Sequence, residues 1–204
     1  MEQDAEQAVL EVAAVRRHRH RAPLRHPFVT AARRTEAVEY VVAEVELAGG
    51  AVGQGSAAET VAVTGEDAAS ILAALDGPLG AALRGARGTI GELSARVAAA
   101  MPGATSAKAA LEVALHDAWA RAAGRPLVEL LGGSAVATMR NDMTVSLEEP
   151  ATMAERAREA VAAGHEILKI KLGHDIAEDR ERLAAVVEAA PSARLRLEIG
   201  RAHV

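Results

Sequence analysis

Two lysines, Lys169 and Lys171, lie two residues apart in the apolar segment EILKIKL, a spacing that suits proton transfer. Residues two apart in a strand point to the same face, so both ammonium groups project together while Leu168, Ile170 and Leu172 project oppositely. Two neighbouring ammonium groups in a partly desolvated site repel each other, and burial also disfavours the charged form. The pair is therefore suited to act as a general base.

The lysine segment lies within a predicted alternation of strands and helices. The predicted elements are a strand at 138–147, a helix at 148–164, a strand at 166–172, a helix at 175–190 and a strand at 193–198. This order predicts a parallel α/β unit, either the start of a barrel or half of an open doubly wound sheet. In a barrel, both lysines enter the interior near the C-terminal end of their strand, where such folds carry active sites.

A competing interpretation makes the lysine segment an edge strand whose ammonium groups face water and hinder aggregation. The K-x-K pattern alone is common and favours this edge-strand interpretation. The surrounding βαβαβ order and the glycine that follows, Gly173, shift the balance towards a functional site.

The N-terminal part of the chain predicts an antiparallel meander. A strand is predicted from Ala8 to Arg21, ending at Pro23, and a second strand covers Glu39 to Leu47. The segment AVGQGSAAE resumes the pattern after a turn of two glycines.

Helices are predicted from Asp67 to about Leu75 and from Ser106 to Ala123, with Ser106 as the N-terminal cap of the second. Apolar residues of the second helix recur at helical spacing: Leu111, Leu115 and Trp119. A neighbouring row of small residues allows another element to approach closely: Ala110, Ala114 and Ala118.

Composition excludes several classes of function. The 204 residues carry a net charge of −5, which gives no electrostatic case for binding nucleic acid or a membrane surface. There is no cysteine, so disulfides, thiolate zinc sites and a cysteine nucleophile are all excluded. No apolar run approaches the length of a membrane helix and the N-terminus does not resemble a signal peptide, so we expect a cytoplasmic protein.

The order of these segments resembles the enolase superfamily, in its muconate-lactonizing-enzyme-like subgroup, and is most similar to the L-Ala-D/L-Glu dipeptide epimerases. The matching stretches are HPFVTAARRTEAVEYVVAEVEL, GAVGQGSAAETVAVTGED, SAKAALEVALHDAWARAAGRPLVELLGG, NDMTVSLEEPATMAERA and EILKIKLG. They span roughly residues 24 to 197 in the family's order, which is more specific than any single motif.

The resemblance implies an α+β capping domain, placed at residues 1–134, followed by the start of a (β/α) TIM-like barrel at residues 135–197. It also implies a divalent metal, usually Mg²⁺, that stabilises the enolate formed when a base removes the proton next to a carboxylate. In this subgroup the second lysine is the base on one face of the substrate, and the first lysine holds and polarises the carboxylate. These roles fall on Lys171 and Lys169.

The resemblance further implies which residues choose the substrate. An arginine of the capping-domain loop pairs with the glutamate side chain in the Ala-Glu epimerases, and it corresponds to Arg33, with Arg34 as the adjacent alternative. Thr144 occupies a first-strand position that lines the substrate site. The competing interpretation of Arg33 and Arg34 is that they are solvated residues of a loop. The competing interpretation of Thr144 is an ordinary β-branched strand residue.

Two further groups have structural explanations. The basic cluster RRHRHR, Arg16 to Arg21, suggests an anion patch, but without neighbouring aromatic residues it is better explained as a solvated strand face. His116 and Asp117 lie on the Trp119 helix, where packing explains them better than catalysis.

The chain departs from the family pattern at its end. Glu198 stands where the family has the aspartate that is its first metal ligand, and the other ligands and the second lysine base belong to later strands. One codon choice for residues 198–204 spells, after its first base, a widely used sequencing adapter. We therefore expect a non-native tail on a truncated N-terminal fragment with little or no epimerase activity.

The leading hypothesis is a fragment of a Mg-dependent dipeptide epimerase acting on small dipeptides derived from cell-wall peptide. Alternatives in the same superfamily are a muconate cycloisomerase, an o-succinylbenzoate synthase and an N-acylamino-acid racemase. A different class is a non-catalytic binding protein that kept only the capping domain. The expected partners are a small-molecule substrate and a second copy in a homo-oligomer, with no nucleic acid and no membrane.

Overall fold

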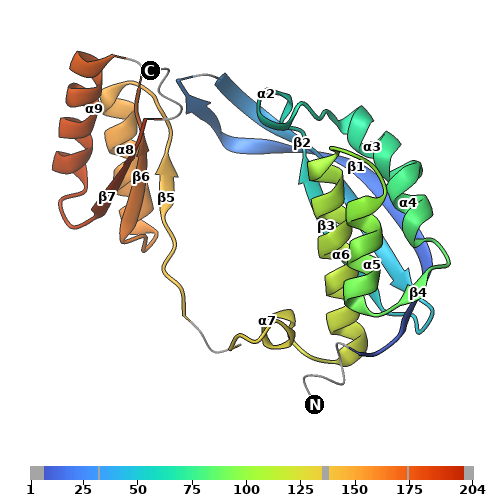
Figure 1. Cartoon of the computed structure of the whole chain (residues 1–204). Helices are drawn as coiled ribbons and strands as arrows, with labels where there is room; N and C mark the ends of the chain where they lie inside the picture. The colour runs from blue at the N-terminus through green and yellow to red at the C-terminus, as the bar shows by residue number, and fades with distance from the viewer. Residues whose placement is uncertain (1–6, 32, 135–137, 174, 200–204) are drawn as a thin grey trace. The chain divides into compact units, whose positions relative to one another are not determined.

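The computed structural model describes residues 7–31, 33–134, 138–173 and 175–199, and these form two compact units (Figure 1). The first unit comprises the described chain up to Ala22 and from Val38 to residue 134, and the second comprises Pro23–Ala37 and the described residues from Thr138 onward. Strands β1 (Leu10–Thr30) and β2 (Arg33–Leu47) contribute residues to both units. The predicted domain boundary at residues 134 and 135 stays a prediction.

The first unit is built on a four-stranded sheet in the order β3-β2-β1-β4, where β3 is Val52–Ala58 and β4 is Arg87–Gly88. Strand β2 pairs antiparallel with β3, and β1 pairs antiparallel with β4. Alternate residues of β2 are buried, as a strand with one covered face requires: Val41, Ala43, Val45 and Leu47. The predicted order of the meander is confirmed.

Strand β1 is longer than its sequence predicted. The expected end at Pro23 is wrong, because β1 continues through Pro23 and Pro27 to Thr30. Proline lacks an N–H but its backbone angle suits extended structure, so it interrupts a strand only where the ladder needs that donor. Strand β2 likewise begins at Arg33, before the predicted Glu39.

Six helices of the first unit lie in the described residues: α2 (Val61–Thr64), α3 (Ala68–Asp76), α4 (Pro78–Leu83), α5 (Ile90–Ala99), α6 (Thr105–Ala123) and α7 (Leu127–Leu130). The predicted helices correspond to α3 and α6. Helices α4 and α5 were not predicted, although Pro78 stands at the start of α4 and Thr89 forms a capping box with Glu92 at the start of α5.

Helix α6 packs directly on β3, which is the close neighbour that its row of alanines allows (Figure 1). A Cβ atom on Gly53 would lie 2.1 Å from the backbone nitrogen of Ala118, and one on Gly55 would lie 2.1 Å from the carbonyl oxygen of Ala110. Only glycine on the strand and alanine on the helix permit this approach of two backbones.

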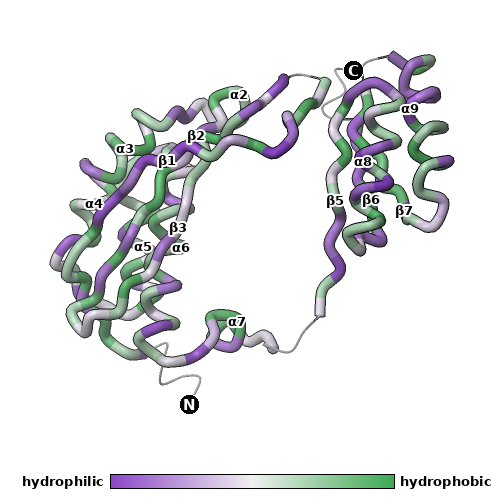
Figure 2. The backbone as a smooth tube through the Cα atoms, turned by 180° about the vertical axis from the view of Figure 1, so that it is seen from behind, coloured by the Kyte–Doolittle hydropathy of each residue, from purple (hydrophilic) through white to green (hydrophobic). Residues whose placement is uncertain are grey.

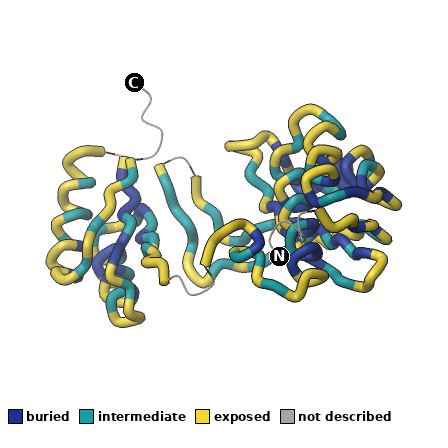
Figure 3. The backbone as a smooth tube through the Cα atoms, turned by 60° about the horizontal axis from the view of Figure 1, so that its bottom comes forward, coloured by how far each residue is buried: buried dark blue, intermediate teal, exposed yellow. Residues whose placement is uncertain are grey.

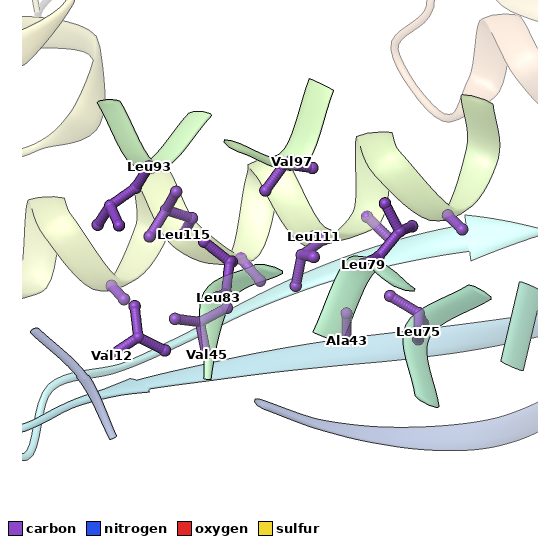
Figure 4. Packing of buried hydrophobic residues seen from close by; sticks show 14 of the residues in the cluster. Val12, Ala43, Val45, Leu75, Leu79, Leu83, Leu93, Val97, Leu111 and Leu115 are labelled. Atoms are coloured by element: carbon purple, nitrogen blue, oxygen red, sulfur yellow. The ribbon is translucent and has the colours of Figure 1, made fainter. Parts of the chain in front are cut away.

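The main core fills the space between these helices and the sheet. Helices α3 to α6 contribute leucine and valine side chains that meet Val12, Ala43 and Val45 of the strands (Figure 4). Leu79, Leu83 and Leu115 are fully buried there. Burial of each such side chain stabilises the fold by about 1.5 to 3 kcal/mol, before the cost of ordering it.

The N-terminus of α6 is capped from a distant part of the chain. The Glu66 carboxylate accepts hydrogen bonds from the Thr105 hydroxyl (3.0 Å) and from the Ser106 amide (2.9 Å) and hydroxyl (2.8 Å). Burial raises the pKa of Glu66, but these hydrogen bonds from Ser106 and Thr105 outweigh it and lower that pKa below its ordinary value. The predicted cap Ser106 is therefore a donor to Glu66, and α6 begins one residue earlier, at Thr105.

The second unit contains a three-stranded sheet in the order β5-β6-β7. Its elements are β5 (Met143–Val145), α8 (Pro150–Ala162), β6 (Ile167–Lys171), α9 (Ile176–Ala189) and β7 (Arg194–Glu198). Strands β5 and β6 are parallel, as are β6 and β7. The βαβαβ prediction is confirmed, although β5 is shorter than the predicted strand at 138–147.

A separate core lies between this sheet and helices α8 and α9. It contains Leu168, Ile170 and Leu172 of the lysine segment, with Met153 from α8 and Val186 from α9. Hydrophobic and hydrophilic stretches alternate along α9 (Figure 2), and buried residues gather inside each unit while many outer positions are exposed (Figure 3). Within the described residues, no helix is both long and apolar enough to cross a membrane.

Candidate active site

The two lysines lie on the face of β6 that points away from the helices. Leu168 and Ile170 are fully buried in the core formed with α8 and α9, so strand alternation directs Lys169 and Lys171 to the opposite face. Strand β6 is the middle strand of its sheet. The edge-strand interpretation of the lysine segment is therefore wrong.

One carboxylate brings the two ammonium groups together. Glu198 is the last residue of β7 and lies opposite Lys171 in the parallel register. Its Oε2 atom is 3.2 Å from the Lys169 Nζ atom, and its Oε1 atom is in close contact with the Lys171 Nζ atom. The hydrogen bond from Lys171 lowers the pKa of Glu198 most, burial raises it, and the bond from Lys169 lowers it further, with a net lowering.

The surroundings of the two lysines differ. The Lys171 side chain is 11% exposed and the Lys169 side chain 35% exposed. The Phe28 ring lies against Lys171, with the Nζ atom 5.7 Å from the ring centroid. Lys171 is thus enclosed by a carboxylate and an aromatic ring, while Lys169 remains more open to solvent.

A buried arginine joins the two loops that follow β5 and β6. The Arg182 side chain on α9 is 9% exposed, and its Nε donates to the Glu148 carbonyl oxygen at 2.9 Å. Its guanidinium also donates to Asp179, whose second oxygen accepts from the Gly173 amide at 2.7 Å. Burial lowers the pKa of Arg182, but the bonds to Glu178 and Asp179 raise it overall.

Sequence reasoning missed this network. A lone arginine on a helix with many charged residues carries no pattern that distinguishes a buried clamp from a solvated side chain.

Thr144 lies in β5, directly opposite Lys169 in the parallel register. Residues paired across neighbouring strands point to the same face, so Thr144 shares the face of the lysines. It also lines a cavity of about 240 Å³ within the second unit, together with Ser146, Arg25 and Arg156. The structure therefore places Thr144 beside Lys169.

The two predicted arginines are not gathered with the lysines. Arg33 and Arg34 open strand β2, and both are exposed. The Arg33 amide donates to the Thr30 hydroxyl at 3.3 Å, and Arg34 pairs with Glu36 at 3.2 Å. The role of Arg33 or Arg34 in binding a substrate side chain stays a prediction.

The described residues do not fit a magnesium site. No group of three His, Asp or Glu side chains lies close enough within them to hold a metal ion. Mg²⁺ needs several oxygen ligands in near-octahedral geometry, whereas both oxygens of Glu198 face ammonium groups. Glu198 alone therefore provides no metal site.

The basic cluster and Asp117, which the sequence also singled out, make structural contacts. In the basic cluster, the His18 Nε2 atom lies 2.6 Å from the Glu44 Oε2 atom on an exposed strand face. His20 stacks on Tyr40, with ring centroids 5.2 Å apart. The Asp117 carboxylate on α6 accepts a hydrogen bond from the backbone N–H of Gln54 at 3.0 Å, which ties the helix to β3.

Comparisons with known proteins show the family to which the chain belongs. Residues 12–132 match the family described as mandelate racemase/muconate lactonizing enzyme, N-terminal domain. The chain is 36% identical over 196 residues to L-Ala-D/L-Glu epimerase from Bacillus subtilis, covering 93% of this chain and 52% of that protein.

Two solved structures are also similar. The substrate-liganded complex of the Bacillus subtilis L-Ala-D/L-Glu epimerase superposes with a TM-score of 0.86 at 33% identity, covering 93% of this chain and 54% of that one. The dipeptide epimerase of Methylococcus capsulatus complexed with Mg and dipeptide L-Arg-D-Lys superposes with a TM-score of 0.85 at 34% identity. The match covers 93% of this chain and 54% of that one. The chain thus spans about half the length of the relatives it matches.

Proposed function

Because this chain belongs to the mandelate racemase/muconate lactonizing enzyme family of the enolase superfamily, we propose that it forms part of a dipeptide epimerase of the L-Ala-D/L-Glu type. One observation carries the proposal. Two lysines on one strand face converge on a single side-chain carboxylate, that of Glu198, and a carboxylate is also the group next to the proton that such an epimerase must remove.

In this proposal the Glu198 carboxylate, which belongs to the tail expected to be non-native, stands in for the substrate carboxylate that the two lysines bind. Charge-assisted hydrogen bonds from two ammonium groups hold a carboxylate more firmly than neutral donors do. Lys169, the more open of the two, holds and polarises the substrate carboxylate. Lys171 accepts the α-proton of one epimer, and as an ammonium group it returns a proton to the same face when the reaction runs in the other direction.

Mg²⁺ is proposed as the cofactor of the whole enzyme, where it would stabilise negative charge on the substrate carboxylate as the proton leaves. The described residues provide no set of ligands for it. The proposal therefore places its ligands, and the base for the opposite face, outside the described residues.

The substrate class is also part of this proposal and is drawn from the names of the relatives. An arginine at position 33 or 34 would pair with the carboxylate side chain of a glutamate in the second position of the dipeptide. Thr144, beside Lys169, would line the same site. The substrates would then be small acidic dipeptides such as those derived from cell-wall peptide.

The experiment is solvent deuterium exchange into L-Ala-L-Glu and L-Ala-D-Glu, followed by ¹H NMR, with Mg²⁺ present. The protein tested is this chain continued by its own reading frame through the family's remaining strands. Exchange at the glutamate α-carbon supports the proposal, and Lys171→Ala should abolish it from one epimer only. Arg158→Ala, at an exposed position on α8, serves as the matched control and should leave both rates unchanged.

Two outcomes contradict the proposal. Absence of exchange from acidic, basic and apolar dipeptides alike, in a protein that binds Mg²⁺, rejects epimerase activity. Equal loss of exchange from both epimers in Lys171→Ala rejects the assignment of Lys171 as the base on one face.

A further inference from the structure

The segment that precedes Arg33 in the chain is tied to the lysine-bearing unit. Residues Pro23–Ala37 belong to the second unit, and the carbonyl oxygen of Val29 accepts a hydrogen bond from the amide of Leu147 at 3.0 Å. Leu147 follows β5 and is itself buried. This bond fixes the backbone directly beside Phe28.

The Phe28 ring distinguishes the two lysines. Both share a strand face and both contact the same carboxylate, but the ring lies 5.7 Å from the Lys171 Nζ atom, within the range of a cation–π contact. The side-chain exposure falls from 35% at Lys169 to 11% at Lys171. A lysine has a flexible four-carbon stem, so an aromatic wall on one side removes many of its conformations.

We propose that Phe28 is a positioning residue for Lys171: its ring holds the ammonium group in line with the carboxylate site. The inference rests on the proposed function for its catalytic meaning, but the contact can be tested by itself. The contact between Phe28 and Lys171 links the segment that contains Arg33 to the proposed base, because residues 28 and 33 both belong to Pro23–Ala37 of the second unit.

The chain is well suited to a direct test. It contains one phenylalanine and only three lysines, Lys108, Lys169 and Lys171. Selective ¹³C labelling of lysine therefore gives three sets of ¹H–¹³C signals, which Lys169→Arg and Lys171→Arg assign. No ligand or activity is needed, so the protein of 204 residues can be used as it is.

In the wild type we expect upfield-shifted Hε signals for Lys171 from the ring current, and a nuclear Overhauser effect between these protons and the Phe28 ring. Phe28→Leu keeps an apolar side chain but removes the ring, so the shift should disappear while the signals of Lys108 stay in place. Phe28→Trp should restore an upfield shift, because indole is the strongest cation–π partner.

The contact is overturned if the wild type shows neither the Overhauser effect nor the shift. It is also overturned if Phe28→Leu folds and leaves the Lys171 signals unchanged. Should Phe28→Leu fail to fold, Phe28→Tyr decides the question, because it retains a ring and must retain the shift.

The catalytic part is tested in the protein continued by its own reading frame. Phe28→Leu should slow exchange from the epimer served by Lys171 by about threefold to tenfold, corresponding to the usual strength of a cation–π contact, and Phe28→Trp should recover most of the rate. Equal slowing of both epimers would reject the positioning role while leaving the proposed function intact. A confirmed ring contact without any exchange would reject the proposed function instead.

Discussion

In the first unit the carboxylate of Glu66 is surrounded by the hydroxyl and amide groups at the start of a long helix, whereas in the second unit the carboxylate of Glu198 is held by two lysine side chains. Both pKa values are lowered, but the donors differ. Those of Glu66 are neutral and belong to one helix terminus, and those of Glu198 are charged and lie at the ends of two lysine side chains. Donors at a helix terminus stabilise a fold, while ammonium groups at the ends of side chains can pair with another carboxylate.

The same contrast extends to packing. Helix α6 touches β3 backbone to backbone through glycine and alanine, which leaves no room for adjustment. The Lys171 side chain is confined instead by a ring and a carboxylate. We therefore expect substitutions in the first unit to change stability and substitutions around the lysines to change mainly local behaviour. Four predictions test this difference.

The largest effect is expected for Gly55→Ala. The new Cβ would lie 2.1 Å from the Ala110 carbonyl oxygen, so helix and strand must separate, at a cost of about 3 kcal/mol in the free energy of unfolding. The fluorescence of Trp119, the single tryptophan, reports unfolding of the first unit in denaturant. Gly49→Ala is the control, because a Cβ at that position meets nothing within 4 Å. Equal denaturant concentrations at the unfolding midpoint of the two variants would contradict the packing argument.

Glu66→Gln should lower the stability of the first unit by about 2 kcal/mol, because a buried carboxylate that accepts several hydrogen bonds is replaced by an amide. The folded pKa of Glu66 is lowered, so its contribution is complete above the unfolded pKa and is lost as pH falls through the folded pKa. The difference between wild type and variant should therefore shrink on acidification. A difference that stays constant with pH would show that the charge is not responsible.

Arg182→Met should destabilise the second unit by about 1.5 kcal/mol, because the Glu148 carbonyl and Asp179 lose a buried donor. Amide hydrogen exchange should speed up at Leu168 and Ile170, and most at Gly173, whose acceptor Asp179 loses its partner. Arg158→Met, at an exposed position, controls for loss of charge alone. Unchanged exchange at Gly173 would mean that Arg182 does not hold this loop.

The smallest effect on stability is expected for Glu198→Gln, about 0.5 kcal/mol, because its side chain is 38% exposed and its ion pairs are screened by salt. Its folded pKa is lowered, so the contribution of the ion pairs is present above the unfolded pKa and disappears as pH falls through the folded one. Lysine ¹³C spectra should nevertheless change clearly at positions 169 and 171. A large loss of stability with little spectral change would reverse the contrast between Glu66 and Glu198.

Much of the fold was predictable because it depends on local periodicity. The alternation around Lys169 and Lys171 predicted the strand and its two faces, and the alanines of α6 predicted the close approach of another element, which the structure identifies as β3. Contacts over long sequence separations were not predictable. Glu66 caps a helix 40 residues away, and Arg182 reaches a carbonyl 34 residues away, and neither leaves a periodic signal in the sequence.

For the site, the face of the lysines and the place of Glu198 at the end of β7 follow from strand spacing. The contact of Phe28 with Lys171 does not follow from it, because it joins residues that are far apart in the chain. The end of β1 beyond Pro23 was missed for a related reason: a proline in a strand is judged by its hydrogen-bonding position, which the sequence does not reveal.

Strands β1 and β2 cross the division between the units, so the second unit is discontinuous in the chain. A polypeptide that starts at Thr138 would lack Val29, whose carbonyl oxygen accepts a hydrogen bond from the Leu147 amide, and Phe28, whose ring lies against Lys171. Expression of that segment alone should therefore give a sheet whose amides are poorly protected against hydrogen exchange. Addition of a peptide with the sequence of residues 23–37 should restore this protection. Successful dissection of this protein must follow spatial units rather than a single cut in the sequence.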